Sequence, residues 1–77
     1  MNVRVLTPDQ TLFSGPVETV YVPAENGEVG ILENHAPYAA ALGQGIIELH
    51  REGKKREIPV TEGVLEVKEN GEVVIFV

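Results

Sequence analysis

Short alternations of apolar and polar residues run along nearly the whole chain, and glycine, proline or asparagine interrupts each of them. A period of two places successive side chains on opposite faces, which is typical of a half-buried β-strand. In residues 45–51, for example, the pattern predicts Ile47 and Leu49 on one face and Glu48 and His50 on the other. The segments that predict strands are VRVLT (3–7), TLFS (11–14), VETVYV (17–22), GIIELHR (45–51), EIPV (57–60), VLEV (64–67) and VVIFV (73–77).

Three glycine-containing pairs separate apolar runs and predict tight turns. They are Asn26-Gly27, Glu52-Gly53 and Asn70-Gly71. Glycine adopts the positive φ that a short hairpin turn requires at little steric cost. The chain is therefore expected to pair its strands mainly as antiparallel hairpins.

One segment, YAAAL at residues 38–42, consists of good helix formers. Five residues between Pro37 and Gly43 are too few for a stable helix, so we predict a strand whose small side chains allow another layer to approach. No repeat, linker or low-complexity run divides the chain. About eight or more short strands in one domain, residues 1–77, indicate an all-β sandwich or flattened barrel.

Composition narrows the classes of function. Twelve acidic residues against six basic ones give a net charge of −6, which argues against nucleic acid as the main partner. The absence of cysteine excludes disulfides and thiolate metal sites. No apolar stretch has the length of a membrane span or a signal peptide, so we expect a soluble, unexported chain that reaches a membrane only through another protein.

Four of the six basic residues lie together in REGKKRE, at residues 51–57. They are Arg51, Lys54, Lys55 and Arg56. One interpretation is a cationic patch for a phosphate or an acidic partner. The other is a charged hairpin tip that keeps the chain soluble and resists pairing of strand edges. The sequence leaves both open.

The stretch GEVGILENHAP, at residues 27–37, contains the side chains best suited to chemistry. Glu28, Glu33 and His35 offer oxygen and nitrogen ligands, but catalytic zinc requires three protein ligands in fixed geometry, and the other histidine, His50, lies in a different predicted strand. Acid–base catalysis would require a pocket that shifts the pKa values of these groups, and a chain this small has little room for one. We therefore favour a surface over an active site.

Within this stretch, two residues receive specific roles. His35 is expected to bond backbone groups in an irregular loop, with Pro37 fixing the direction in which the chain leaves. Glu28 lies between Gly27 and Gly30, which would let the loop bend and hold the carboxylate outward. Glu28 is thus a candidate contact residue.

Taken in order, these segments resemble a known family. LTPDQTLFSGPVETVYVPAENGEVGILENHAPYAAALGQGIIELH, followed by TEGVLEV, is similar to the N-terminal β-sandwich domain of the epsilon subunit of F-type ATP synthases, called delta in mitochondria. The most specific parts of the resemblance are LFSG followed by VE, GEVGIL followed by HAP, and then GVLEV. The resemblance implies about ten short, mostly antiparallel strands in two sheets. It also implies a non-catalytic rotor subunit that binds the gamma subunit and the c-ring.

The resemblance implies roles for four residues. Glu28 matches a glutamate that faces the polar loops of the c-ring, and Thr7, His35 and Ala40 match positions on or near the surface against gamma. No catalytic residue, cofactor or metal is implied. The resemblance implies a location at the cytoplasmic face of a bacterial plasma membrane, or of an equivalent membrane, where the chain is attached through the c-ring. An uncovered apolar partner surface would also favour a weak homodimer.

The chain departs from the family pattern at several points. Glu33-Asn34 stands where the family usually has Pro-Gly, and we expect Asn34 to preserve the turn because asparagine reaches left-handed angles. Glu62 replaces a glycine of a common S-G-G. The family's C-terminal helices have no counterpart in the 77 residues, so inhibition of hydrolysis and ATP binding are not implied.

A rival hypothesis is a free-standing β-sandwich binding or carrier module. A biotinyl or lipoyl carrier displays a lysine at a hairpin tip, and Lys54-Lys55 is the one candidate for it. The methionines that usually flank a biotinyl lysine are absent.

Overall fold

A computed structural model describes all 77 residues, and it is all-β, with nine strands and no helix. The strands are β1 (Asn2–Leu6), β2 (Thr11–Pro16), β3 (Thr19–Ala24), β4 (Gly27–Leu32), β5 (Tyr38–Leu42), β6 (Gly45–Arg51), β7 (Lys54–Val60), β8 (Gly63–Val67) and β9 (Val73–Phe76). The prediction of an all-β chain of short strands is confirmed, with nine strands in place of about ten.

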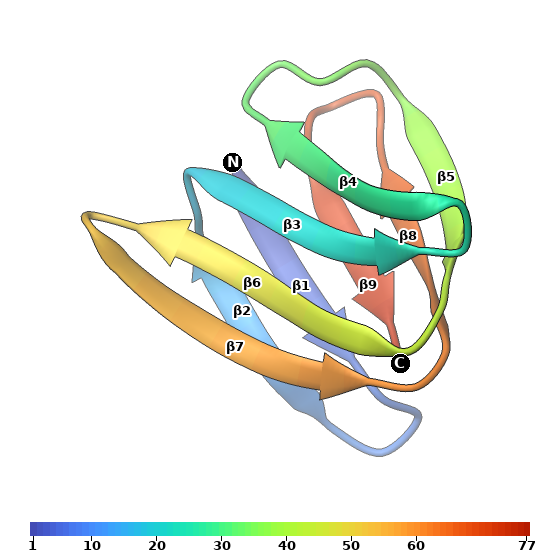
Figure 1. Cartoon of the computed structure of the whole chain (residues 1–77). Coiled ribbons are helices and arrows are strands. Elements are labelled where there is room, and N and C mark those ends of the chain that lie inside the picture. Colours follow the sequence, from blue (N-terminus) through green and yellow to red (C-terminus); the bar gives the residue numbers. More distant parts are fainter.

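The strands form two layers (Figure 1). β4, β3, β6 and β7 make the front layer, and β2, β1, β9, β8 and β5 make the back layer. The layers are parts of one folded sheet, since β3 and β5 are joined by the single pair Ala24–Leu42. β1 and β9 run parallel, and all other paired strands run antiparallel.

The core lies between the two layers and consists of aliphatic side chains. No polar or charged residue is buried. Its 15 members are Val3, Val5, Val17, Val20, Val22, Ile31, Leu42, Ile47, Leu49, Ile58, Val60, Leu65, Val67, Val73 and Ile75. Ile47 and Leu49 point inward while Glu48 and His50 stay partly exposed, as the alternation of β6 predicts.

The turns follow the predicted glycine pairs. Gly27, Gly53 and Gly71 have φ values of 125°, 73° and 86°, and each lies at a chain reversal. Asn34 has φ 65°, so the expectation that it replaces a glycine in the left-handed region is also confirmed. The segment 38–42 is a strand, as predicted for its small residues.

The sequence missed one strand. Residues 27–32, predicted as a loop, form β4, which pairs with β3 along its whole length. Gly30 does not bend the chain there. A Cβ on Gly30 would lie 3.1 Å from the Tyr21 ring, so this glycine leaves room for the ring to lie across the strand.

The predicted end of β3 before Pro23 and the predicted start of β7 at Glu57 were also wrong. β3 runs on through Pro23, which has no N–H to donate but whose carbonyl accepts a bond from Gly43 N at 2.8 Å. β7 begins at Lys54, three residues before the predicted start, and contains Pro59. β7 is an edge strand, where a missing N–H is tolerated.

Gly63 allows β8 and β9 to approach closely, and its replacement by alanine tests this packing. A Cβ there would overlap the backbone carbonyl of Phe76. We expect Gly63→Ala to lower the free energy of unfolding by about 1–3 kcal/mol, measured by urea denaturation. Gly43→Ala is the matched control, because its Cβ would be no closer than 4.0 Å to a non-neighbouring atom. Equal stability of the two variants would contradict the steric argument.

Asn34 provides a second test, of backbone strain in the β4–β5 loop. At φ 65° a residue with Cβ is strained, and the asparagine side chain tolerates this angle better than alanine does. We expect Asn34→Ala to destabilise the chain by about 1 kcal/mol and Asn34→Gly to be neutral or stabilising, in thermal unfolding. The reverse order would show that the Asn34 side chain, and not its backbone angle, matters.

Candidate partner-binding surface

An apolar row crosses the outer face of the back layer. Residues directly opposite on paired strands share a face, and the pairs Ala41–Val64, Val64–Phe76 and Leu6–Phe76 join four strands in register. We call these four residues the apolar row. Val64 and Phe76 are each 49% exposed, which is high for side chains of this size near the centre of a sheet. The row is therefore a solvent-facing apolar strip, and Ala41, Val64 and Phe76 line an open hollow together with Glu25 and Glu62.

Val74 lies on the same outer face but is only 2% exposed, and it is not part of the core cluster. Its cross-strand neighbour is Arg4, whose Nε lies 3.2 Å from a carboxylate oxygen of Glu72. Arg4 and Glu72 thus flank Val74, and Lys68 joins them at 3.8 Å from Glu72. The apolar row is bordered on this side by paired charges.

Thr7 and Ala40 adjoin the two ends of the apolar row. Thr7 follows Leu6, and its hydroxyl accepts bonds from Asp9 N at 3.2 Å and Gln10 N at 3.0 Å, which closes the β1–β2 turn. Ala40 is paired with the buried Leu65, so it faces inward, while Ala39 and Ala41 are exposed on the outer face of β5. The side chain of Thr7 is thus engaged in its own turn.

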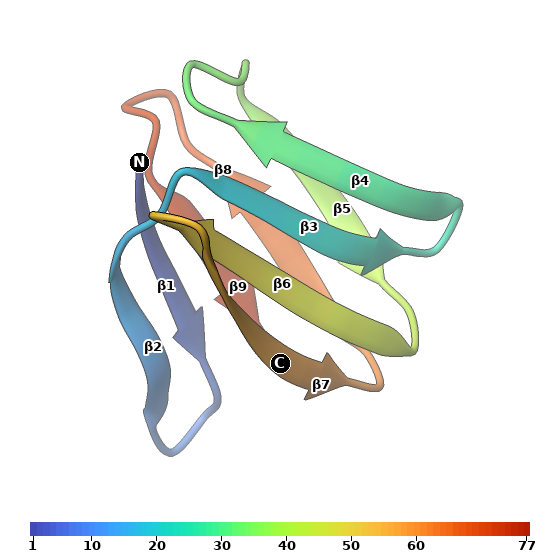
Figure 2. The same cartoon turned by 60° about the vertical axis from the view of Figure 1, so that its left-hand side comes forward.

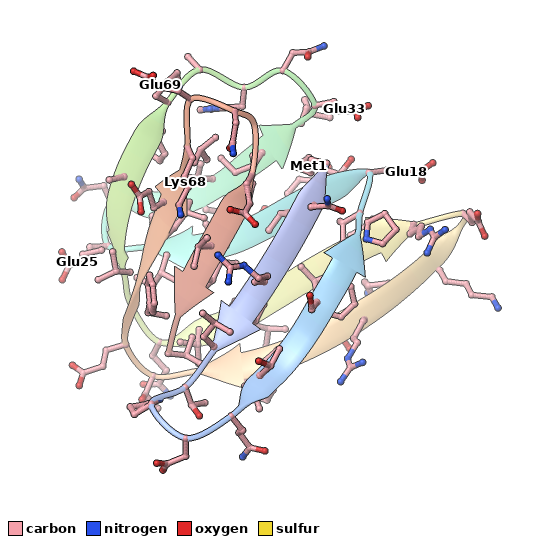
Figure 3. All side chains as sticks on the ribbon, turned by 180° about the vertical axis from the view of Figure 1, so that it is seen from behind. Met1, Glu18, Glu25, Glu33, Lys68 and Glu69 are labelled. Atoms are coloured by element: carbon pink, nitrogen blue, oxygen red, sulfur yellow. The ribbon has the colours of Figure 1, made fainter.

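His35 lies in the β4–β5 loop, where the expected backbone contact is present. Its Nδ1 is 2.6 Å from the carbonyl of Ala36, and its ring meets Tyr38 edge-on at 5.6 Å. Glu33 in the same loop lies 3.3 Å from the amino group of Met1, on the side of the molecule shown in Figure 3. The loop is held by local contacts and packs against the first residue of β5.

Glu28 lies on the outer face of β4, two residues after the turn at Glu25-Asn26. It is exposed, and neither Glu28 nor Glu25 has a cation within 4.0 Å. Glu25 is fixed through its backbone, which donates to Ala41 O at 3.1 Å. The two carboxylates therefore form an unpaired acidic end of the β3–β4 hairpin, and Glu25 projects from the edge of the molecule in Figure 3.

The structure does not bring Glu28 and His35 together. A hollow between β4 and β5 contains Glu25 and Glu28 but not His35. The shared pocket that acid–base catalysis would require is thus not formed. No group of three or more His, Cys, Asp or Glu side chains is placed to hold a metal ion. The structure also contains no helix suited to spanning a membrane.

Sequence reasoning missed the apolar row, although a signal was available. VVIFV is apolar at every position, so its strand must expose apolar side chains on the face opposite the core. Figure 2 shows β8 and β9 side by side in the back layer, where their outer faces combine. The row depends on cross-strand register, which no single segment reveals.

Comparison with known proteins agrees with this architecture. The family model described as ATP synthase, Delta/Epsilon chain, beta-sandwich domain matches residues 1–77. An ATP synthase epsilon chain of Synechococcus sp. (strain JA-2-3B'a(2-13)) is 45% identical over the whole chain, which covers 56% of that relative. One from Leptospira borgpetersenii is 43% identical over 91% of the chain and 55% of the relative. The chain thus spans about half the length of these relatives.

Solved structures show the same fold. A chain in the Euglena gracilis mitochondrial ATP synthase, in a structure of OSCP, F1 and c-ring, superposes with a TM-score of 0.89 at 28% identity. The match covers 96% of this chain and 48% of that one. A chain in the central stalk and c-ring of Tetrahymena thermophila mitochondrial ATP synthase superposes with a TM-score of 0.81 at 15% identity. This match covers 97% of the present chain and 60% of the Tetrahymena chain. The resemblance seen in the sequence is confirmed, and the chain belongs to the family of ATP synthase delta/epsilon chain β-sandwich domains.

Proposed function

We propose that this domain is a non-catalytic element of the central stalk of an F-type ATP synthase, which links the gamma subunit to the c-ring. In that place it couples ion translocation to ATP synthesis. Membership of the family supports the proposal, as does the likeness to a chain of the Euglena complex whose description names F1 and the c-ring. The domain would lie at the cytoplasmic face of a bacterial plasma membrane or its equivalent, held there through the c-ring.

The observation that carries the proposal is the apolar row. A protein partner gains most of its binding energy from a central apolar contact that excludes water. The row supplies such a contact on the outer face of the back layer, with Thr7 next to Leu6 at one end and Ala40 next to Ala41 at the other. We assign this face to the gamma subunit. Because Ala40 points inward, exposed Ala39 and Ala41 make the close contact of β5 in this proposal.

Glu28 has a different role in the proposal, facing the polar loops of the c-ring. An exposed ion pair contributes little energy but favours one orientation of the partner. The two carboxylates of the β3–β4 hairpin are unpaired within the domain, so no internal salt bridge must break when a basic partner binds. His35 helps to keep its loop in place before Tyr38, at the end of β5 away from Ala41 and the apolar row.

Phe76→Lys tests the gamma contact. The substitution places a charge in the apolar row, so we expect binding to a separately expressed gamma subunit to weaken at least about tenfold, measured by isothermal titration calorimetry. Ile46→Lys is the matched control: Ile46 is 47% exposed but lies in the front layer. Unfolding curves of both variants show whether each remains folded. A larger loss of binding with Ile46→Lys would move the contact to the front layer.

Glu28→Lys tests the contact with the c-ring. An exposed strand charge changes stability by less than about 0.5 kcal/mol, so folding is expected to be nearly unchanged. Co-purification with the c-ring in the presence of gamma should fall severalfold, and the loss should shrink at high salt. Glu69→Lys is the control, with the same charge change in the β8–β9 turn, well away from Glu25 in Figure 3. Strong unfolding of Glu28→Lys with normal assembly would make the residue structural.

A further inference from the structure

The inner face of the β6–β7 hairpin changes from apolar to positively charged where the hairpin extends past the core. Its cross-strand pairs Ile47–Ile58, Leu49–Arg56 and Arg51–Lys54 lie on one face, since residues directly opposite share a face. The first pair is buried, and Leu49 is 3% exposed. Beyond it the same inner face carries Arg51, Lys54 and Arg56. A face that is aliphatic in the core is thus cationic toward the tip.

These cations, together with Lys55 and Glu52, line a hollow of about 440 Å³ between the hairpin and β2. Leu49 and Phe13 supply its apolar part. The volume lies within the roughly 300–1,000 Å³ of sites that hold small molecules. The guanidinium of Arg56 is 5.6 Å from the centre of the Phe13 ring, and its Nη2 donates to Leu12 O at 3.3 Å. Arg56 is therefore held at the edge of the hollow by β2.

The cations of the inner face lack good partners within the chain. Lys54 and Arg56 have no carboxylate within 4.0 Å, and Arg51 has only Glu52, at 3.8 Å, with both side chains more than half exposed. On the outer face of the same hairpin, Lys55 is paired with Glu57 at 3.7 Å. In a chain with a net charge of −6, unpaired positive charge is thus confined to this hollow and its rim.

We propose that this hollow binds a phosphate group, with Arg51, Lys54 and Arg56 around the phosphate and the apolar part of the ligand against Phe13. Guanidinium groups donate two parallel hydrogen bonds to phosphate oxygens, and lysine adds a compact charge. The phosphate belongs either to a soluble phosphate ester or to the headgroup of an anionic lipid. This site is separate from the apolar row and from Glu28, and it does not depend on the proposed function.

The proposal differs from attraction by net charge in what each lysine should contribute. If attraction of an anion depends on net charge alone, Lys54 and Lys68 are equivalent, because each carries one positive charge. If the hollow binds phosphate, Lys54 contributes more, because Lys54 lines the hollow, whereas Lys68 follows β8 and lies beside Glu72. The variants Lys54→Gln and Lys68→Gln change the net charge equally and separate the two cases.

The experiment measures binding of three probes to the 77-residue chain at constant ionic strength. Inorganic phosphate and glycerol 3-phosphate are followed by calorimetry, and phosphatidylglycerol vesicles by sedimentation. We expect saturable binding that Lys54→Gln weakens about tenfold and Lys68→Gln less than about twofold. Arg51→Gln should act like Lys54→Gln, and circular dichroism checks that all variants are folded. Glutamine keeps hydrogen-bonding capacity, so the loss reports the charge in the hollow.

Each outcome decides the proposal. If the soluble probes bind and the variants weaken binding as expected, the ligand is a soluble phosphate ester. If only the vesicles bind and the variants weaken that binding as expected, the ligand is a lipid headgroup. Absence of saturable binding of any probe overturns the proposal. Equal weakening by Lys54→Gln and Lys68→Gln also overturns it, because attraction to an anion would then depend on net charge and not on the hollow.

Discussion

The fold depends on the corner at which one sheet folds over itself. β3 and β5 meet at the single pair Ala24–Leu42, flanked by the bonds from Glu25 N to Ala41 O and from Gly43 N to Pro23 O. A sheet with one apolar face must cover that face, and this corner brings the two inner faces together. Because β5 leaves β3 after one pair, β4 and β5 diverge and leave a hollow between them. The corner thus sets both the core and the position of the β3–β4 hairpin.

The same corner relates the two proposed partner surfaces. Ala41, an end of the apolar row, accepts the backbone bond from Glu25, whose side chain belongs to the acidic end. A rotor element that touches gamma and the c-ring at once needs a fixed angle between the two contacts. The hydrogen bond from Glu25 N to Ala41 O links the two surfaces directly, and the aliphatic core behind them holds the two layers together. Any change that loosens the corner should therefore affect both contacts together.

Much of the fold was predictable from sequence because alternation and turn glycines are local signals. β6 was predicted with its exact ends, and the positive φ at Gly53 follows from its place between two alternating runs. β4 was missed because Gly27 and Gly30 break its alternation, and Gly30 is explained only by Tyr21 on the neighbouring strand. The apolar row was missed for a related reason, since its members come from four strands whose register is a property of the folded sheet.

The candidate residues show the same division between local and long-range information. The backbone contact of His35 could be predicted because it lies within one loop, whereas the inward direction of Ala40 is set by pairing with Leu65. If charge alone decided binding energy, Glu28 would be the most important of the candidate contact residues. Yet an exposed charge pair contributes at most about 1 kcal/mol, while a half-exposed aromatic covered by a partner contributes more. Affinity for the stalk should therefore depend mainly on Phe76 and Val64, with Glu28 determining how the domain is oriented on its second partner.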